Sequence, residues 1–308
     1  MATPREPVFP LVAQRRITGV SAGAQASNRR GPGSEVATTR PYRRGDNIRT
    51  VDWAASARVS AARDADEFIV RDYYADESLR VVTVLDRRPE MALFPAPFPW
   101  LDKGKAITAA AALIAGSTAA ARGAPGLVDL NDPHDPRWLL PRPRNAAKIR
   151  QHVWRGRPFT GPADVLERSF DLLLRARGEL PGDTFVFVLS DFVECPADDA
   201  WRRLLERRWD VVPVLIQDPR WEQSFPEVGG LALPVVDPRS GAPALLSVSR
   251  REARAQRERN ERRFAGLRWR FEQLRLDPVL LESAEPADVL AAFTSWAEAR
   301  RRRLRRSA

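Results

Sequence analysis

Short apolar runs alternate along the chain with longer segments in which apolar residues recur every three or four positions. The runs at 80–86 and 184–189 are nearly continuous, which is typical of strands buried on both faces of a parallel sheet. Residues 100–122, 164–177 and 250–276 have the spacing of helices that bury one face. Strands that alternate with helices predict a doubly wound, mostly parallel α/β sheet with helices on both faces.

The shorter predicted strands and helices alternate in the same way, whereas the beginning of the chain has no such pattern. Residues 1–30 contain scattered Pro, Ser, Gly and Ala, so we expect an irregular segment there. We divide the chain into an N-terminal arm with a loop-like segment, residues 1–78, which packs on a main α/β domain, residues 79–308. Further strands are predicted at 66–74 (an edge strand), 127–130, 138–140, 211–216 and 279–281, a hairpin at 231–236 and 244–248, and helices at 146–154, 197–208 and 286–303.

The chain is strongly basic, and the basic excess lies near the C-terminal end. A net charge of +10 and a pI of about 10.8 favour acidic partners such as nucleic acid, an anionic membrane surface or an acidic protein. Within 250–275, Arg and Glu are interleaved, as on a solvated helix face. The densest basic group could bind nucleic acid or anionic lipid, or could form a frayed, solubilising tail. It comprises Arg300, Arg301, Arg302, Arg303, Arg305 and Arg306.

Cysteine content and hydropathy indicate a cytoplasmic protein. Cys195 is the single cysteine, so no disulfide can form within the chain, which favours a reducing compartment. The N-terminus lacks the basic start and apolar core of a signal peptide. The most apolar run, 106–121, is shorter than the roughly 20 residues that span a bilayer, and we expect a buried helix there.

Two of the predicted strands end in an aspartate. Asp86 follows the apolar run of the first strand, and Asp191 follows the run at 185–189. Parallel strands bring their carboxyl ends to the same edge of a sheet, where open α/β sheets place their binding crevice. Asp86 and Asp191 are therefore predicted to belong to one site.

Residues 31–58 have neither a helical nor a strand period, and charged, aromatic and glycine residues alternate there. The composition of 44–47 is that of a turn. We expect a structured loop held by specific side-chain pairs. The segment resembles the hallmark of the family known as domain of unknown function 58. The matching positions, called the hallmark residues below, are Arg40, Pro41, Tyr42, Gly45, Asp46, Arg49, Asp52, Trp53, Ala57 and Arg58.

The resemblance continues more loosely to Phe293, Trp296 and Arg300, which match the closing helix of the family. It implies a von Willebrand factor A-like fold. It also implies a partner, because such proteins are typically encoded beside MoxR-type AAA+ ATPases. Many relatives carry two N-terminal membrane helices, and this chain resembles the short form without them.

The resemblance also implies a metal site, which this chain keeps only in part. In the von Willebrand factor A fold, the strand-end aspartate begins a D-x-S-x-S loop. Its serines, a threonine and a second aspartate complete an oxygen cage for Mg²⁺. Here Arg88 and Glu90 stand in the serine positions and Ala163 stands in the threonine position. Asp86 and Asp191 are retained.

The charge of Arg88 leaves three interpretations of this degenerate site. A guanidinium offsets the carboxylates and repels a divalent cation, so our leading hypothesis is that Arg88 replaces the ion. Its partner would be Asp86, Asp191 or Glu90. Alternatively, Arg87 and Arg88 both point to solvent, or the site still binds Mg²⁺. We expect neither a metal nor another cofactor.

The hallmark residues have two interpretations. Their two aspartates and three arginines could form a buried ion-pair network, with Tyr42 and Trp53 in the core. The alternative is a docking surface for the ATPase. The network is our leading interpretation, because buried arginine–carboxylate pairs hold a defined geometry.

Enzyme signatures are absent from the sequence. It contains no Walker loop and no dinucleotide fingerprint. His134 lies in a turn-like segment, His152 lies in a predicted helix where we expect a structural role, and Cys195 has no histidine nearby in sequence. We predict a non-enzymatic protein-interaction adaptor that works with a MoxR-type ATPase in client remodelling or complex assembly. The alternatives are a nucleic-acid-binding protein that uses the Arg-rich C-terminal helices, and a divalent-cation-dependent adhesion-type domain.

Overall fold

The chain forms two compact units. Met1–Gln14 and Arg80–Ala308 make up the main unit, and Arg15–Leu79 make up the N-terminal unit. The boundary lies next to the predicted division after residue 78, but residues 7–14 belong to the main unit and not to an N-terminal arm. The computed structural model describes residues 7–14, 20–21, 24–30, 36–64, 66–76, 79–92, 100–131, 136–227, 229–237 and 240–306.

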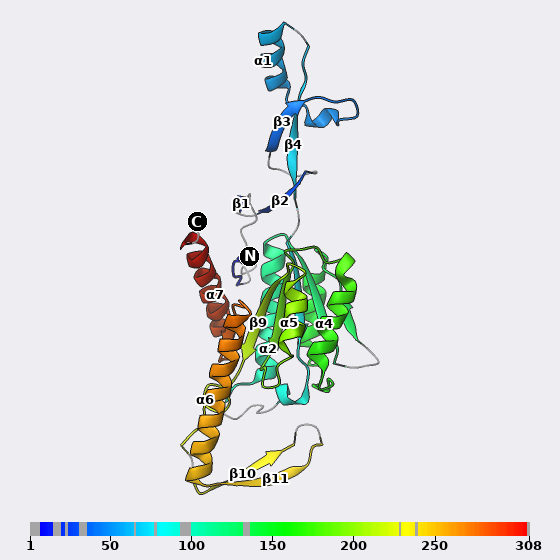
Figure 1. The fold of residues 1–308 in the computed structure, drawn as a ribbon. Helices are drawn as coiled ribbons and strands as arrows, with labels where there is room; N and C mark the ends of the chain where they lie inside the picture. The colour runs from blue at the N-terminus through cyan, green and yellow to red at the C-terminus, as the bar shows by residue number, and fades with distance from the viewer. Residues whose placement is uncertain are drawn as a thin grey trace, which may run out of the picture. The chain divides into compact units, whose positions relative to one another are not determined.

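The main unit is built on a six-stranded sheet with the strand order β12-β9-β8-β5-β6-β7 (Figure 1). Neighbouring strands are parallel, except that β7 pairs antiparallel with β6 at one edge. The predicted doubly wound α/β architecture is therefore confirmed, with β5 and β8 as inner neighbours. The strands are β5 (Arg80–Leu85), β6 (Ala124–Asp129), β7 (Arg137–Leu139), β8 (Phe185–Ser190), β9 (Asp210–Ile216) and β12 (Val279–Leu281).

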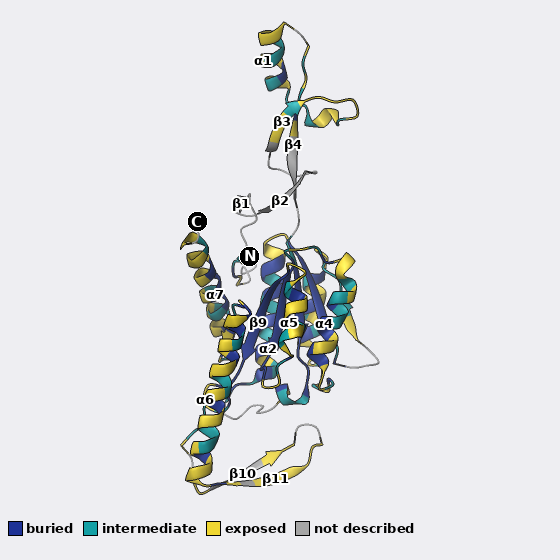
Figure 2. Ribbon diagram, viewed as in Figure 1, coloured by how far each residue is buried: buried dark blue, intermediate teal, exposed yellow. Residues whose placement is uncertain are grey.

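Helices cover both faces of this sheet, and its inner strands are buried (Figure 2). On one face, Val82 and Val84 of β5 join a core cluster with residues of α4, α5 and the C-terminal part of α6. On the other face lie α2, α3 and α7, and Phe187 of β8 contacts Phe293 of α7. The helices are α2 (Lys103–Ala120), α3 (Asn145–Trp154), α4 (Val165–Arg175), α5 (Asp198–Leu205), α6 (Arg250–Gln273) and α7 (Pro286–Arg306).

α2 contains the apolar run that predicted a buried helix. It begins at Asp102, whose side chain accepts a hydrogen bond from the Lys105 N–H at 2.8 Å. Ala106, Ala110 and Ala111 are fully buried, and their small side chains let the helix lie close to the sheet. Among the described residues, no helix is both long enough and apolar enough to cross a bilayer.

The predicted hairpin and the long helix after it are both present. β10 (Leu231–Val236) pairs with β11 (Pro243–Val248) in a separate two-stranded sheet. α6 follows directly and begins with a capping box, in which the side chains of Ser249 and Glu252 accept each other's backbone N–H. Phe271, on the predicted apolar face of α6, is fully buried.

The N-terminal unit has more regular structure than its sequence predicts. Its strands form an antiparallel sheet in the order β1-β2-β4-β3, so β4 is an inner strand and the predicted edge position is wrong. Residues 24–30, expected to be irregular, form β2 because they pair with β4. The segment expected to be a loop contains α1, whose Ala and Ser residues have no apolar period. The elements are β1 (Val20–Ser21), β2 (Ala24–Arg30), β3 (Val36–Pro41), the 3-10 helix η1 (Ile48–Thr50), α1 (Trp53–Arg63) and β4 (Ile69–Asp76).

The C-terminal arginines do not form a frayed tail, because α7 is helical to the end of the described chain. Arg300 is 2% exposed, and its Nη1 donates to both carboxylate oxygens of Asp210 at 2.9 and 2.8 Å. The same nitrogen donates to the Val12 carbonyl at 3.1 Å, so it ties residues 7–14 to the sheet. Arg300 is therefore a core residue, whereas the neighbouring Arg301 is exposed.

Arg300→Met is expected to lower the free energy of unfolding of the main unit by about 3–5 kcal/mol, because the buried Asp210 loses its charge partner. Arg301→Met is the matched control and should leave stability nearly unchanged, since Arg301 is exposed. Urea unfolding followed by tryptophan fluorescence measures both variants. Equal midpoints for the two would show that the pair with Asp210 contributes nothing to stability.

Candidate functional site at the carboxyl end of the sheet

The ends of β5 and β8 bring the two predicted aspartates together. Asp86 directly follows β5, Asp191 directly follows β8, and both are buried. The Asp86 N–H donates to the Leu189 carbonyl of β8 at 2.9 Å, so the parallel pairing continues into the site. Ser190 Oγ donates to Asp86 Oδ2 at 2.6 Å and joins the two strand ends.

Arg88 lies between these carboxylates. Its Nε and Nη2 donate to the two oxygens of Asp86 at 3.0 and 2.7 Å in a forked pair. Nη2 also lies 3.5 Å from Asp191 Oδ1, and Nη1 donates to Glu194 at 3.1 Å. The side chain is 3% exposed, so the alternative in which Arg88 points to solvent is wrong. Pairing with Asp86 and Asp191 was predicted, and Glu194 is an additional partner.

A second buried cation, Lys103, was not predicted. It begins α2, and its Nζ donates to Asp191 Oδ2 and to Glu222 Oε1, both at 2.7 Å. Burial opposes its charge, but the two carboxylates raise the pKa of Lys103 above its ordinary value, so it stays protonated. A signal was available in the sequence. Lys103 is a rare lysine in an Arg-rich chain, at the N-terminus of an apolar helix where a cation is unfavourable without a buried partner.

The oxygens that would bind an ion are already bonded within the chain. Both oxygens of Asp86 accept hydrogen bonds from Arg88. Asp191 Oδ1 accepts the Val193 N–H at 3.1 Å, and its Oδ2 accepts Lys103. Mg²⁺ requires oxygen ligands in near-octahedral geometry, whereas two cationic side chains contact these oxygens. The residues present do not fit a magnesium ion.

The other two positions of the degenerate cage are less buried than Asp86, Arg88 and Asp191. Ala163 is exposed, and Glu90 is half-buried in the 3-10 helix η2 (Pro89–Ala92). The loop before Ala163 approaches the site through its backbone, because the Gly161 N–H donates to the Arg87 carbonyl at 2.8 Å. A Cβ on Gly161 would lie 3.0 Å from that oxygen, so glycine permits the close approach.

Arg87 belongs to a second buried ion cluster beside the first. It is 1% exposed, so the alternative that placed Arg87 in solvent is also wrong. Its Nε lies 3.4 Å from Asp129 Oδ2, and its guanidinium carbon lies 4.9 Å from the ring centroid of Phe159. His152 Nε2 lies 2.8 Å from the same Asp129 oxygen, a structural contact of the kind expected for it. Burial alone would raise the pKa of Asp129, but the His152 hydrogen bond and the Arg87 charge lower it below its ordinary value.

The hallmark aspartates form separate, partly buried ion pairs and not the expected buried network. Arg40 and Asp46 make a forked pair at 2.7 and 2.8 Å, and this hydrogen bonding lowers the pKa of Asp46 to about 2. The turn before Asp46 uses Gly45, whose φ of +103° favours glycine. Asp52 caps α1 and pairs at 2.7 Å with Arg71, which is not a hallmark residue.

Several hallmark residues are exposed, which corrects the prediction that they belong to the core. Tyr42 and Trp53 are 38% and 62% exposed. Their rings contact Phe68 edge to face, with centroid distances of 6.5 and 6.0 Å. The neighbouring α1 consists mainly of Ala and Ser, which provide too little apolar surface to cover them. Arg49 and Arg58, which were expected in ion pairs, are also exposed. So are Pro41 and Ala57.

The sequence also pointed to two further groups, Cys195 and His134. Cys195 is half-buried, and burial raises the pKa of its thiol to about 11, so little thiolate is present at neutral pH. His134 lies outside the described residues.

The family described as Protein of unknown function DUF58 matches residues 38–265. The chain belongs to this family. The matched region includes the hallmark residues, the two strand-end aspartates and Lys103, and it ends within α6. A comparison with curated proteins gives no match. Membership in DUF58 was predicted from the hallmark spacing, and it is confirmed.

In this DUF58 protein, Lys103→Met is expected to lower the free energy of unfolding by about 3–5 kcal/mol, because two buried carboxylates lose their shared cation. Lys105→Met is the matched control. Lys105 lies two residues after Lys103 in the first turn of α2. Its partner Glu285 is 67% exposed, so losing the Lys105 charge should change the unfolding midpoint little. Thermal unfolding measures both variants, and a stable Lys103→Met variant would show that the bridge is dispensable.

Proposed function

We propose that this DUF58 protein is a non-enzymatic adaptor that binds a MoxR-type AAA+ ATPase and brings client proteins to it for remodelling or complex assembly. The partner follows from the family resemblance. A von Willebrand factor A-like identity for the main unit is part of the same proposal. It is supported by the parallel sheet with Asp86 and Asp191 at the ends of neighbouring strands.

The observation that carries the proposal is the set of buried ion pairs at the carboxyl end of the sheet. Arg88 and Lys103 neutralise the strand-end carboxylates from within the chain. Strand-end carboxylates that are held by side chains of the same chain support recognition through other surfaces over chemistry at this edge. The high pKa of Cys195 supports the same conclusion, because a protonated thiol is a weak nucleophile.

The exposed aromatic residues of the N-terminal unit are the proposed docking surface. Tyr42 and Trp53 both contact Phe68, and the three side chains remain 38–62% exposed. Tyr, Trp and Arg are the residue types enriched at the energetic centres of protein interfaces. Exposed Arg43 and Arg49 lie close in sequence to these rings, so the complementary surface on the partner is acidic with an apolar centre.

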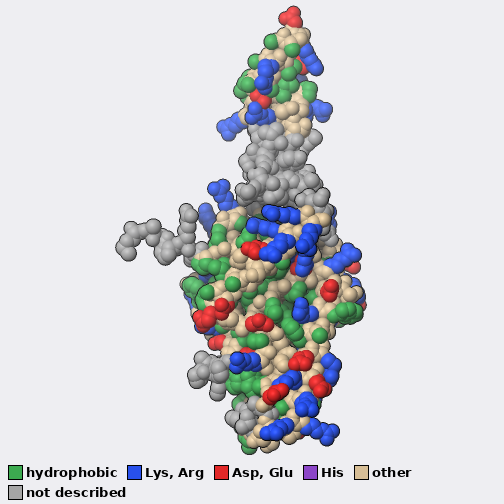
Figure 3. Space-filling view, turned by 90° about the vertical axis from the view of Figure 1, so that its left-hand side faces the viewer, with side chains coloured by type: hydrophobic (Ala, Val, Ile, Leu, Met, Phe, Trp, Pro, Cys, Tyr) green, Lys and Arg blue, Asp and Glu red, His purple; other side chains and the backbone are tan. Residues whose placement is uncertain are grey.

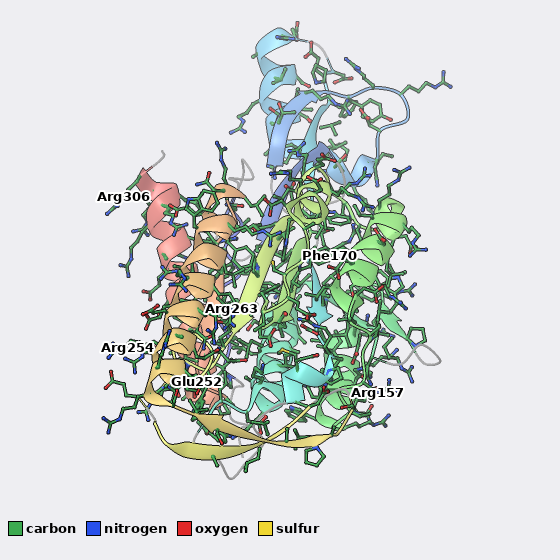
Figure 4. The ribbon with its side chains drawn as sticks, turned by 60° about the horizontal axis from the view of Figure 1, so that its bottom comes forward. Arg157, Phe170, Glu252, Arg254, Arg263 and Arg306 are labelled. Atoms are coloured by element: carbon green, nitrogen blue, oxygen red, sulfur yellow. The ribbon has the colours of Figure 1, made fainter. Side chains whose placement is uncertain are left out.

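Nucleic-acid binding by the C-terminal helices has less support. Figure 3 shows the side of the main unit that carries α6 and α7, where acidic side chains lie between the basic ones. Within the arginine cluster, Arg300 is buried and Arg303 pairs with Asp277. Arg306 lies at the end of α7 (Figure 4) and is exposed. A steep fall of DNA binding with added salt would favour this alternative.

Magnesium is expected to leave the thermal unfolding of the protein unchanged, because cationic side chains already hold the strand-end carboxylates. At a concentration 1,000 times its dissociation constant, a ligand that binds only the folded state stabilises it by about 4 kcal/mol. The melting temperature in 1 mM MgCl₂ or MnCl₂ is compared with that in NaCl of equal ionic strength. A rise of several degrees, or a micromolar dissociation constant by calorimetry, would contradict the loss of metal binding.

The immobilised full-length chain is expected to retain a purified MoxR-type ATPase from the same host in the presence of ATP. Trp53→Ala should weaken this binding about tenfold or more, because truncating a central interface tryptophan commonly costs over ~2 kcal/mol. Trp154→Ala is the matched control, since Trp154 is 67% exposed on α3 of the other unit. Biolayer interferometry gives the dissociation constants. No binding by the unmodified chain would reject the partner, and equal losses in both variants would reject the docking surface.

A further inference from the structure

The β10–β11 hairpin exposes an uncharged apolar surface. None of its strand residues is charged, although 29% of the chain is charged. Val236 and Leu245 are 57% and 69% exposed, and Val235 on the opposite face is 39% exposed. The hairpin lies beyond the N-terminal end of α6 and apart from the main sheet (Figures 1 and 2). Isolated apolar hairpins are marginally stable in water, and exposed apolar patches mark interaction sites.

The hydrogen-bonding register shows which backbone groups point outward. The Asp237 N–H donates to the Ala242 carbonyl at 3.0 Å, so these residues form a hydrogen-bonded pair. Such pairs alternate along an antiparallel hairpin with pairs whose N–H and C=O groups point away from the partner strand. Both prolines of the hairpin fall in outward-pointing pairs, where they cost the ladder no hydrogen bond. The outward-pointing pairs are Val236–Pro243, Pro234–Leu245 and Ala232–Ser247.

The two edges of the hairpin differ in their capacity to bind another strand. On β10, Pro234 interrupts the row of outward N–H groups in the middle of the strand. On β11, Leu245 and Ser247 present consecutive outward N–H and C=O groups, and Pro243 stands only at the first position. Within the described residues, β11 pairs with β10 and with no other strand. An open edge with apolar side chains is a template for an added strand.

The hairpin is held at a defined position by its junction with α6. Val248 is 5% exposed, and its carbonyl accepts the Gly230 N–H at 2.9 Å. A Cβ on Gly229 would lie 2.2 Å from the Cγ of Arg250, so the two segments approach closely because of the glycine. Ser249 then caps α6. The β11 edge is therefore ordered before binding, which lowers the entropic cost of adding a strand.

We propose that β11 binds an extended, apolar and uncharged polypeptide segment, which adds to the hairpin as a third strand. The outward N–H and C=O groups of Leu245 and Ser247 supply the hydrogen bonds, and the uncharged strands select against charged segments, because burying an unpaired charge is costly. Unfolded proteins expose such segments. The inference rests on the proposed adaptor function and names the class of its client.

Fluorescence anisotropy of a labelled peptide of alternating Val and Thr, titrated with the full-length chain, tests this inference. Ser247→Pro removes one outward N–H from β11 and leaves the internal hydrogen bonds of the hairpin intact, so binding should weaken about tenfold or more. Ala232→Pro is the matched control. Ala232 is the cross-strand partner of Ser247, and its N–H also points outward, but from the β10 edge. The Ala232→Pro variant should therefore bind like the unmodified chain. Circular dichroism checks that both variants fold.

Two results would overturn the inference. The first is no binding by the unmodified chain, or equal binding by the chain and its Ser247→Pro variant. The second is a dimer, seen by sedimentation velocity, that Ser247→Pro abolishes, because the edge would then belong to a second copy. The assay contains no ATPase. Peptide binding without ATPase capture would therefore reject only the adaptor partnership, and capture without peptide binding would reject only the added strand.

Discussion

Two buried carboxylates at neighbouring strand ends are the constraint on which the main unit depends. β5 and β8 are parallel neighbours, so Asp86 and Asp191 meet at one edge of the sheet. Like charges repel strongly away from water, and the edge is stable only with cations at hydrogen-bonding distance. Arg88 supplies one cation from the loop after β5, and Lys103 supplies the other from α2. The same charges therefore join a strand, a loop and a helix.

A cationic side chain of the protein differs from a bound metal ion in its capacity to take up a new ligand. A metal ion with an open coordination position can accept a carboxylate from a partner protein. The Arg88 guanidinium already bonds both oxygens of Asp86, and Lys103 already bridges Asp191 and Glu222. The proposed adaptor function therefore assigns recognition to surfaces outside the sheet edge. The exposed hallmark aromatics and the β11 edge are the surfaces proposed for it, and each offers apolar contact.

The main unit could be predicted from the sequence because each of its elements has a local signal. The strands β5 and β8 are continuous apolar runs, and α6 has a helical apolar period. The N-terminal unit has weaker local signals. β2 is polar and forms because it pairs with β4, which is distant in sequence. α1 has no apolar face, and its start depends on the Asp52 cap. Where pairing and capping determine the structure, hydrophobic periodicity does not reveal it.

The site was predictable to the extent that its contacts are local. Asp86 and Arg88 are two residues apart, and their pairing follows from that spacing, whereas Lys103 lies 88 residues from Asp191 and 119 from Glu222. A charged residue in a sequence is ordinarily assigned to the surface, because burying it without a partner is costly. That assignment fails wherever folding brings a distant carboxylate to it. It failed for Arg300, which begins the densest run of arginines and yet lies in the core. A run of basic residues therefore indicates a basic surface only to the extent that its members are not buried in ion pairs.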